Sequence, residues 1–301
     1  MKFRPVPIAL GLAAALSTIP VFAAEVVTSI KPLELLVKAV AGDQVQVTTL
    51  VPVGASPHNY TMKPSQRRAL EQADRIFWVG PEMETFLGRL LGSEEFEGRV
   101  TAFTDTGEAS HHHHAHHHGH HHDHGDGNDP HIWTDPALAL GMARDIHARL
   151  ITLEELDRQQ LDSNLVRFEQ GLARTDQQIR RQLATLHGSS LFAYHSAFER
   201  FANHYGLSLE GVLTLNPELT PGARHVAEVQ HQLHQASQPC LLTEPQFNRQ
   251  WWQSITEGLD ITFSTWDPLA TEIASTGDGY LRFLQSVADA ALACLPEQAE
   301  H

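Results

Sequence analysis

The fold is decided by one long stretch, residues 153–187, which reads LEELDRQQLDSNLVRFEQGLARTDQQIRRQLATLH. Its apolar residues recur at helical intervals, and Thr152 with Glu155 has the spacing of a capping box. Gly188 ends the pattern. At the usual rise of an α-helix it would be about 50 Å long, which is more than one small domain needs. The stretch predicts a rigid helix that connects two domains. A coiled coil is the alternative, although the heptad is irregular.

Strands alternate with helices on both sides of this stretch. Before it we expect strands at 26–30, 45–51 and 75–79 and helices at 32–41 and 64–73. After it we expect strands at 190–194, 207–213, 239–243 and 261–265 and helices at 197–205, 221–235, 250–258 and 279–293. This alternation implies parallel sheets covered by helices. We therefore expect an α/β fold with two parallel-sheet lobes, at residues 24–152 and 188–301, joined by the connecting helix 153–187.

The N-terminus has the pattern of a secretory signal peptide, residues 1–23. Lys2 and Arg4 precede an apolar run at 8–20, and small residues allow cleavage after Ala23. A membrane anchor is the alternative, but the run is short for a span and no basic cluster follows it. Without a cysteine near the cleavage site, lipid attachment is not expected. The pattern therefore predicts an exported protein.

Composition narrows the range of partners. A chain of 301 residues is long enough for about two domains. Its formal charge of −15 repels nucleic acid and anionic membranes. It attracts cations only weakly and without selectivity. The two cysteines, Cys240 and Cys294, suggest a disulfide in an exported protein, and the alternative is a two-thiolate metal site.

A low-complexity segment, residues 107–129, interrupts the first lobe. Of the 14 residues at 111–124, 11 are histidine. These are His111, His112, His113, His114, His116, His117, His118, His120, His121, His122 and His124. The segment lacks the apolar residues that offset ordering entropy, so we expect a disordered loop. It is either a weak, multi-site collector or sensor of metal ions, or a solvated spacer.

Ligand-type side chains follow several predicted strands. His58, His195 and Asp267 each come after a strand, where open α/β sheets place their binding sites. His131 follows the histidine-rich segment, in a stretch that two X-Pro steps stiffen. Three neutral imidazoles with a carboxylate or a water suit tetrahedral Zn²⁺, whereas manganese prefers more oxygen ligands. Spacing alone is a weak signal, since no short-spaced ligand motif is present.

Seven motifs together resemble a known family. They are Val27-Thr-Ser-Ile-Lys-Pro-Leu33, Val53-Gly-Ala-Ser-Pro-His-Asn-Tyr60, Trp78-Val-Gly-Pro-Glu-Met-Glu84, Asp129-Pro-His-Ile-Trp133, Tyr194-His195, Thr243-Glu-Pro-Gln-Phe247 and Asp267-Pro-Leu269. From about residue 25 to 295 the chain resembles the cluster A-I substrate-binding proteins. Within this family it is most similar to the ZnuA-like zinc-binding components of zinc-uptake ABC transporters.

The resemblance implies two α/β lobes joined by one long helix, with metal in the cleft between them. It implies that His58, His131 and His195 are the zinc ligands. It also matches Cys240 and Cys294 to a disulfide in the C-terminal lobe. This sequence has Pro57 where some relatives have a glutamate ligand. The fourth ligand is then a water or Asp267, and otherwise Asp267 orients an imidazole.

The expected function is binding rather than catalysis. The resemblance implies a periplasmic protein that captures Zn²⁺ and delivers it to the membrane permease of an ABC importer, and we expect a monomer. Glu82 and Glu84 suggest an exposed acidic patch that faces the permease. The alternatives are a zinc buffer or chaperone without a transporter, and a zinc hydrolase. Against a hydrolase, the sequence has no His-Glu-x-x-His helix and no obvious general base beside a ligand.

Overall fold

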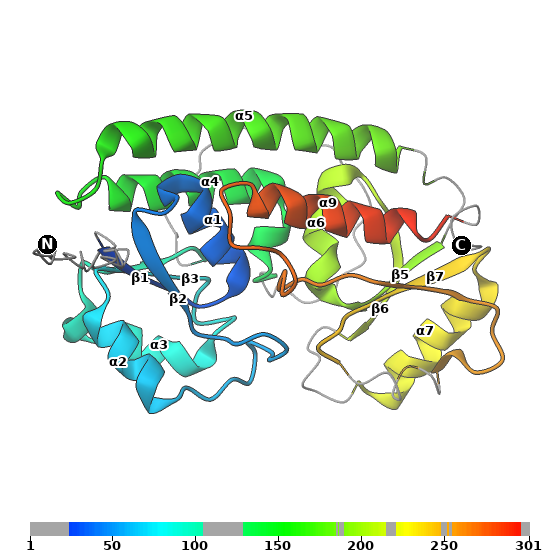
Figure 1. Ribbon diagram of the computed structural model, residues 1–301. Helices are drawn as coiled ribbons and strands as arrows, with labels where there is room; N and C mark the ends of the chain where they lie inside the picture. Colours follow the sequence, from blue (N-terminus) through cyan, green and yellow to red (C-terminus); the bar gives the residue numbers. More distant parts are fainter. Residues whose placement is uncertain are drawn as a thin grey trace, which may run out of the picture.

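The computed structural model describes residues 24–104, 129–184, 186, 190–214, 221–247, 252 and 255–295. The predicted signal peptide and nearly all of the histidine-rich segment lie outside these residues, as do residues 250, 251, 253 and 254 of the helix predicted at 250–258. Two four-stranded sheets lie side by side, and α5 runs along both of them (Figure 1). The predicted α/β fold class is confirmed.

The first sheet has the strand order β2-β1-β3-β4, and every pair is parallel. Its strands are β1 (Ala24–Thr28), β2 (Val45–Thr49), β3 (Arg75–Trp78) and β4 (Val100–Ala102). The accompanying helices are α1 (Lys31–Ala41), α2 (Pro64–Gln72), α3 (Thr85–Leu91) and α4 (Pro136–Leu150), with a short 3₁₀ turn at Ile132–Thr134. Because all strands run the same way, their carboxyl ends meet at one edge of the sheet.

The second sheet repeats this arrangement with the order β6-β5-β7-β8, again fully parallel. Its strands are β5 (Ser190–His195), β6 (Leu209–Thr214), β7 (Pro239–Thr243) and β8 (Thr262–Thr265). Its helices are α6 (Glu199–Tyr205), α7 (Ala223–Gln235) and α9 (Gly279–Leu292). Every residue of β5 is buried, as expected of a central parallel strand.

The connecting helix α5 spans Arg158–Leu183. It begins later than the predicted start at 153, because the Asp157 side chain caps it by accepting a hydrogen bond from Gln160 N at 3.1 Å. The residues between Ile151 and Asp157 form turns, and two of their leucines, Leu153 and Leu156, are still buried in the core. The apolar pattern of this segment therefore reflects packing of a turn rather than another helical turn.

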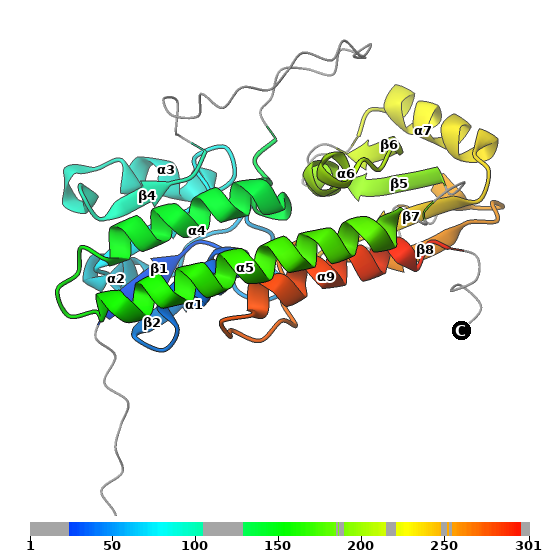
Figure 2. The ribbon, with the colours of Figure 1, turned by 90° about the horizontal axis from the view of Figure 1, so that it is seen from above.

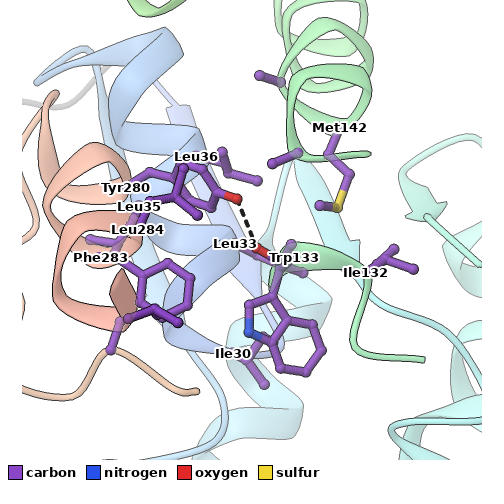
Figure 3. Close-up of a cluster of buried hydrophobic side chains, with 14 of the residues drawn as sticks. Ile30, Leu33, Leu35, Leu36, Ile132, Trp133, Met142, Tyr280, Phe283 and Leu284 are labelled. Carbon is purple, nitrogen blue, oxygen red and sulfur yellow. Dashed lines mark hydrogen bonds between the residues drawn. The ribbon is translucent and has the colours of Figure 1, made fainter. Parts of the chain in front are cut away.

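One hydrophobic core runs through both lobes. The helix α5 packs against α1, α4 and α9, and α9 crosses from the second lobe to contact α1 (Figure 2). Figure 3 shows Tyr280 of α9 beside Leu35 and Leu36 of α1 and beside Trp133. The Tyr280 hydroxyl donates to Trp133 O at 2.7 Å, and Trp133 Nε1 donates to Pro268 O at 2.7 Å. Apolar packing and buried hydrogen bonds thus join the two lobes.

Cys240 of β7 and Cys294, just beyond α9, form the predicted disulfide. Both residues are buried, and the bond ties the last helix to a central strand of the second sheet. The alternative of a two-thiolate metal site is therefore wrong. Among the described residues, no helix combines the length and the apolar character needed to cross a membrane.

Candidate metal centre

Three histidines meet where the two lobes face each other. His58 lies in the loop after β2, His131 lies just before α4, and His195 is the last residue of β5. One ring nitrogen of each lies within 4.8 Å of the others, and the ring centroids of His131 and His195 are 4.5 Å apart. These three residues were predicted from strand ends and family motifs, and the structure brings them together in a pocket of about 270 Å³.

A carboxylate orients His131. Asp129 Oδ1 lies 2.6 Å from His131 Nδ1 and accepts a hydrogen bond from His131 N at 3.1 Å. An anionic oxygen can only accept, so Nδ1 carries the proton and the lone pair remains on Nε2. His131 Nε2 is buried and has no hydrogen-bond partner in the described part of the chain. The histidine therefore presents a nitrogen lone pair, suited to a metal ion, that no group among the described residues satisfies.

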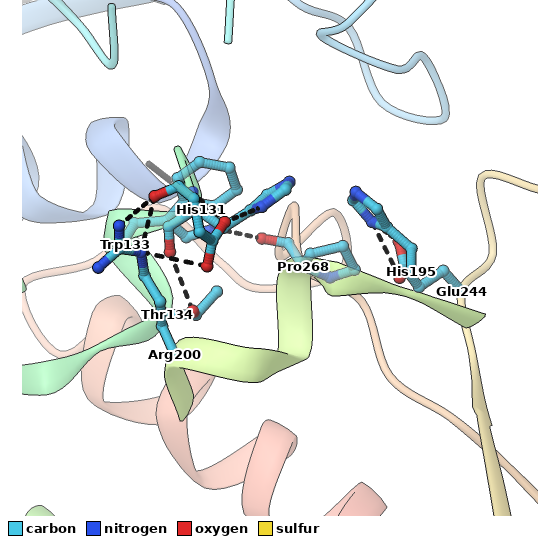
Figure 4. A network of polar contacts seen from close by, with 8 residues as sticks. His131, Trp133, Thr134, His195, Arg200, Glu244 and Pro268 are labelled. Carbon is cyan, nitrogen blue, oxygen red and sulfur yellow. Dashed lines mark hydrogen bonds and ion pairs between the residues drawn. The ribbon is translucent and has the colours of Figure 1, made fainter. Parts of the chain in front are cut away.

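Arg200 of α6 fixes this carboxylate from the opposite lobe (Figure 4). Its Nε donates to Asp129 O at 2.8 Å and lies 3.2 Å from Asp129 Oδ2. Burial would raise the pKa of Asp129, but the hydrogen bond from His131 and the charge of Arg200 bring that pKa below its usual value. Asp129 therefore stays ionised and can keep accepting from the imidazole.

His195 has a matching arrangement in the second lobe. Its Nδ1 lies 3.3 Å from Glu244 Oε1, and the Glu244 side chain is only 1% exposed. His195 Nε2 is buried without a partner among the described residues. Glu244 follows β7 directly, so the strand-end argument that found His195 applied to it as well, but it was not predicted. Such carboxylate–histidine pairs are typical of zinc sites, because they fix the tautomer and raise ligand basicity.

Two of the histidines, His58 and His131, are held as neutral bases. Burial, followed by repulsion from His131 and His195, lowers the pKa of His58 to about 3. Burial also lowers the pKa of His131 to about 4, against the opposing effect of Asp129. Metal binding requires unprotonated imidazole, so these two side chains need not lose a proton near neutral pH.

Apolar side chains enclose the histidines. The pocket wall includes Pro57, Trp133, Phe247, Pro268 and Leu269. These groups supply no competing ligand and lower the local dielectric, which strengthens the attraction between an ion and the oriented imidazoles. His58 is the only one of the three histidines that is not fully buried, so it lies nearest to solvent.

Asp267 does not join the histidine group. Its Oδ1 accepts from Gln246 Nε2 at 2.5 Å and from Leu269 N at 2.9 Å, and its Oδ2 accepts from Thr271 N at 2.7 Å. It does not line the pocket, although Gln246 does. Among the described residues Asp267 also makes no hydrogen bond to an imidazole. The structure thus places it behind Gln246, engaged by its own turn.

The structure corrects the prediction that Glu82 and Glu84 together form an exposed acidic patch. Glu84 is fully buried, not part of an exposed acidic patch, and it accepts from Val79 N at 3.3 Å and Gly80 N at 3.0 Å. Burial raises the pKa of Glu84 to about 7, even though these hydrogen bonds favour the charged form. Its neighbour Glu82 is exposed, as predicted.

A family model described as "Zinc-uptake complex component A periplasmic", ZnuA, matches residues 26–294 of the chain. The chain belongs to the ZnuA family. Among its relatives, the high-affinity zinc uptake system protein ZnuA of Yersinia pestis is 36% identical over 291 residues, covering 90% of this chain and 91% of that protein. The protein of the same description from Haemophilus ducreyi is 31% identical, covering 91% and 94%.

Solved structures in this family share the fold. A crystal structure of ZnuA superposes with a TM-score of 0.70 at 23% identity, covering 88% of this chain and 98% of that chain. The periplasmic zinc-binding protein TroA of Treponema pallidum gives a TM-score of 0.76 at 21% identity, covering 90% and 98%. The resemblance seen in the motifs is therefore confirmed, and the two-lobed α/β fold is that of the ZnuA family.

Proposed function

We propose that this protein is the zinc-binding component of a zinc ABC importer, which captures Zn²⁺ in the periplasm and delivers it to the membrane permease. The observation that carries the proposal is the pair of buried Nε2 atoms of His131 and His195, which have no hydrogen-bond partner among the described residues. Each belongs to an imidazole whose Nδ1 faces a carboxylate. The names of the relatives, which describe a high-affinity zinc uptake system, support the same cargo and a role in its uptake.

In this proposal His58, His131 and His195 bind the ion. Three imidazole nitrogens fit Zn²⁺ well, because it accepts nitrogen ligands in tetrahedral sites and has no need of additional oxygens. A water is the fourth ligand we favour, since both oxygens of Asp267 are already engaged by protein donors. The histidine-rich loop at 107–129 serves as a weak collector beside this tight site.

The proposal extends to the whole chain. The signal peptide 1–23 directs export, cleavage after Ala23 leaves a soluble periplasmic monomer, and the lobes 24–152 and 188–301 meet around the connecting helix. The joint core and the hydrogen bonds of Trp133 and Tyr280 favour small lobe movements. Release then requires the permease to displace a ligand, and the half-buried His58 on its loop is the most accessible one.

A zinc hydrolase is less well supported. Three histidines with an open position also occur in catalytic sites, which need a general base near the metal-bound water. The carboxylates beside the histidines, Asp129 and Glu244, each face an imidazole Nδ1 instead. The alternative of a zinc buffer without a transporter differs from the proposal only in its partner.

Zinc titration against a competing chelator tests the site. The starting protein lacks residues 111–124, so that the loop does not contribute, and we expect it to bind one zinc tightly. His58→Ala, His131→Ala and His195→Ala together should abolish that binding. As a matched control, His225→Ala, His231→Ala and His234→Ala change three exposed histidines of α7 and should leave it intact. Tight binding by the first triple variant would overturn the assignment.

Transport is tested separately. Deletion of the gene should prevent growth of the source organism under zinc limitation. The wild-type gene should restore growth, and the His58→Ala, His131→Ala, His195→Ala variant should not. Cross-linking of the zinc-loaded protein to the permease should detect a complex. Normal zinc-limited growth of the deletion strain, without such a complex, would favour the buffer.

A further inference from the structure

The side-chain amide of Gln246 lies in the wall of the histidine pocket. Its Oε1 is buried and accepts no hydrogen bond in the described part of the chain. A buried carbonyl oxygen without a donor costs stability, so such atoms usually mark a place where a ligand or an ordered water binds. This is the same signature that His131 Nε2 and His195 Nε2 carry.

Asp267 determines which way this amide faces. Oxygen and nitrogen of a glutamine are assigned from their hydrogen-bond partners. The Asp267 carboxylate accepts from Leu269 N, Thr271 N and Thr271 Oγ1, so it acts as an acceptor. The group of Gln246 that contacts it at 2.5 Å must therefore be the Nε2 donor. The Oε1 atom is then directed away from Asp267.

We infer that Gln246 Oε1 accepts a hydrogen bond from a water molecule that completes the coordination of zinc, and that Asp267 is a positioning residue for this amide. The inference rests on the proposed function and deepens it. Three imidazoles leave one tetrahedral position for a water, and zinc polarises that water into a strong donor. The orphan carbonyl oxygen of Gln246 is a suitable acceptor for it.

Direct coordination by the amide is the less favourable arrangement. Protein ligands of zinc are thiolates, imidazoles and carboxylates, whereas carbonyl oxygens suit calcium and other oxygen-preferring ions. A neutral acceptor for bound water adds no negative ligand to the three imidazoles. Gln246 thereby favours zinc over ions that need several oxygen ligands, and Asp267 contributes without touching the metal.

The test removes the acceptor while keeping the size of the side chain. Gln246→Leu should weaken zinc binding about tenfold, as is usual for partners of metal ligands. With Co²⁺ in place of zinc, the visible absorption of the variant should change, because the water is no longer fixed. Gln178→Leu, the same substitution at an exposed position of α5, should alter neither quantity.

A double-mutant cycle tests the positioning role. Asp267→Asn should weaken zinc binding in the same direction, and combining it with Gln246→Leu should cause little further loss, because both act through one amide. A merely structural role would lower the melting temperature and leave the Co²⁺ spectrum of the folded protein unchanged. Additive losses would overturn the positioning role of Asp267.

Two results would overturn the inference as a whole. One is a Gln246→Leu protein with the zinc affinity and Co²⁺ spectrum of the wild type. The other is X-ray absorption or a zinc-bound crystal structure in which a protein atom, from Gln246 or Asp267, occupies the fourth position. If the wild type itself fails to bind zinc, the proposed function falls instead. If the wild type binds zinc and Gln246→Leu binds it equally well with the same Co²⁺ spectrum, the inference about Gln246 fails and the proposed function stands.

Discussion

At the scale of single residues, Glu244 has the clearest consequence for zinc binding. It orients His195 from a fully buried position. Glu244→Ala leaves Nδ1 without its acceptor, so the ring can rotate or change tautomer. We expect zinc affinity to fall about 10–100-fold, as measured by competition with a chelator. Glu257→Ala, at an exposed position of the same lobe, is the control and should bind as the wild type does. An equal affinity for both variants would contradict this role.

Glu84 gives a prediction about pH. Its pKa is about 7 in the folded protein against 4.5 as the reference, so the folded state binds more protons than the unfolded state between these values. The contribution of Glu84 to stability is therefore complete below pH 4.5 and is lost as the pH rises through about 7. Glu84→Gln should remove this part of the pH dependence.

Urea unfolding at about pH 5 and about pH 7.5 measures how the stability of the protein depends on the charge of Glu84. Relative to the wild type, Glu84→Gln should be more stable at the higher pH than at the lower one. Glu82→Gln, which changes the exposed neighbouring glutamate, should follow the wild type at both values. Parallel behaviour of the two variants would show that Glu84 does not titrate in this range.

The limits of prediction from sequence are clearest at the same scale. The strand-end argument singled out His58, in the loop after β2, and His195, at the end of β5, whereas His131 was singled out by its X-Pro steps and the family motifs. The same argument placed Asp267 at the cleft, but its turn supplies backbone donors that no sequence pattern reveals. Similarly, Glu84 looks exposed because it is charged, and only the backbone amides of Val79 and Gly80 explain its burial.

At the scale of elements, close helix packing depends on Gly171. A Cβ added there would lie 2.7 Å from Leu281 Cδ1, whereas one added at Gly141 of α4 would meet nothing within 4 Å. Gly171→Val should therefore displace the Leu281 side chain, loosen the packing of α5 on α9 and destabilise the protein by about 1–3 kcal/mol. Gly141→Ala should stabilise it by about 1 kcal/mol through helix propensity. Chemical denaturation measures both, and a stabilised Gly171→Val would contradict the packing described.

Most strands and helices were predictable, and the exceptions have physical causes. The strands from β1 to β3 and from β5 to β8 are short apolar runs between turn residues, and they lie within a few residues of the predicted positions. The strand β4 was missed because Val100–Ala102 is too short to show alternation. The helix α3 was missed because it has only 7 residues, too few to show a helical period. The helix α4 was missed because its residues follow the histidine-rich segment with many alanines and only a weak apolar stripe.

At the scale of the whole molecule, the joint core predicts that zinc changes the distance between lobes little. Glu71 and Glu228 are exposed and lie in different lobes. Spin labels attached to the Glu71→Cys and Glu228→Cys double variant report the distance between the lobes by pulsed electron paramagnetic resonance. We expect nearly the same distribution with and without zinc. In Tyr280→Phe, which loses the hydrogen bond to Trp133 O, the distribution should broaden. A shift of many ångströms on zinc binding would indicate hinge closure instead.

The position of α9 also constrains the order of events during biogenesis. This helix covers α1, among the first elements to emerge, yet it is near the end of the chain and is fastened to β7 by the Cys240–Cys294 bond. Until α9 has formed, the part of α1 that it covers stays exposed, although α4 and α5 also pack on α1. The core of the first lobe is therefore complete only once α9, a helix of the second lobe, has docked on α1.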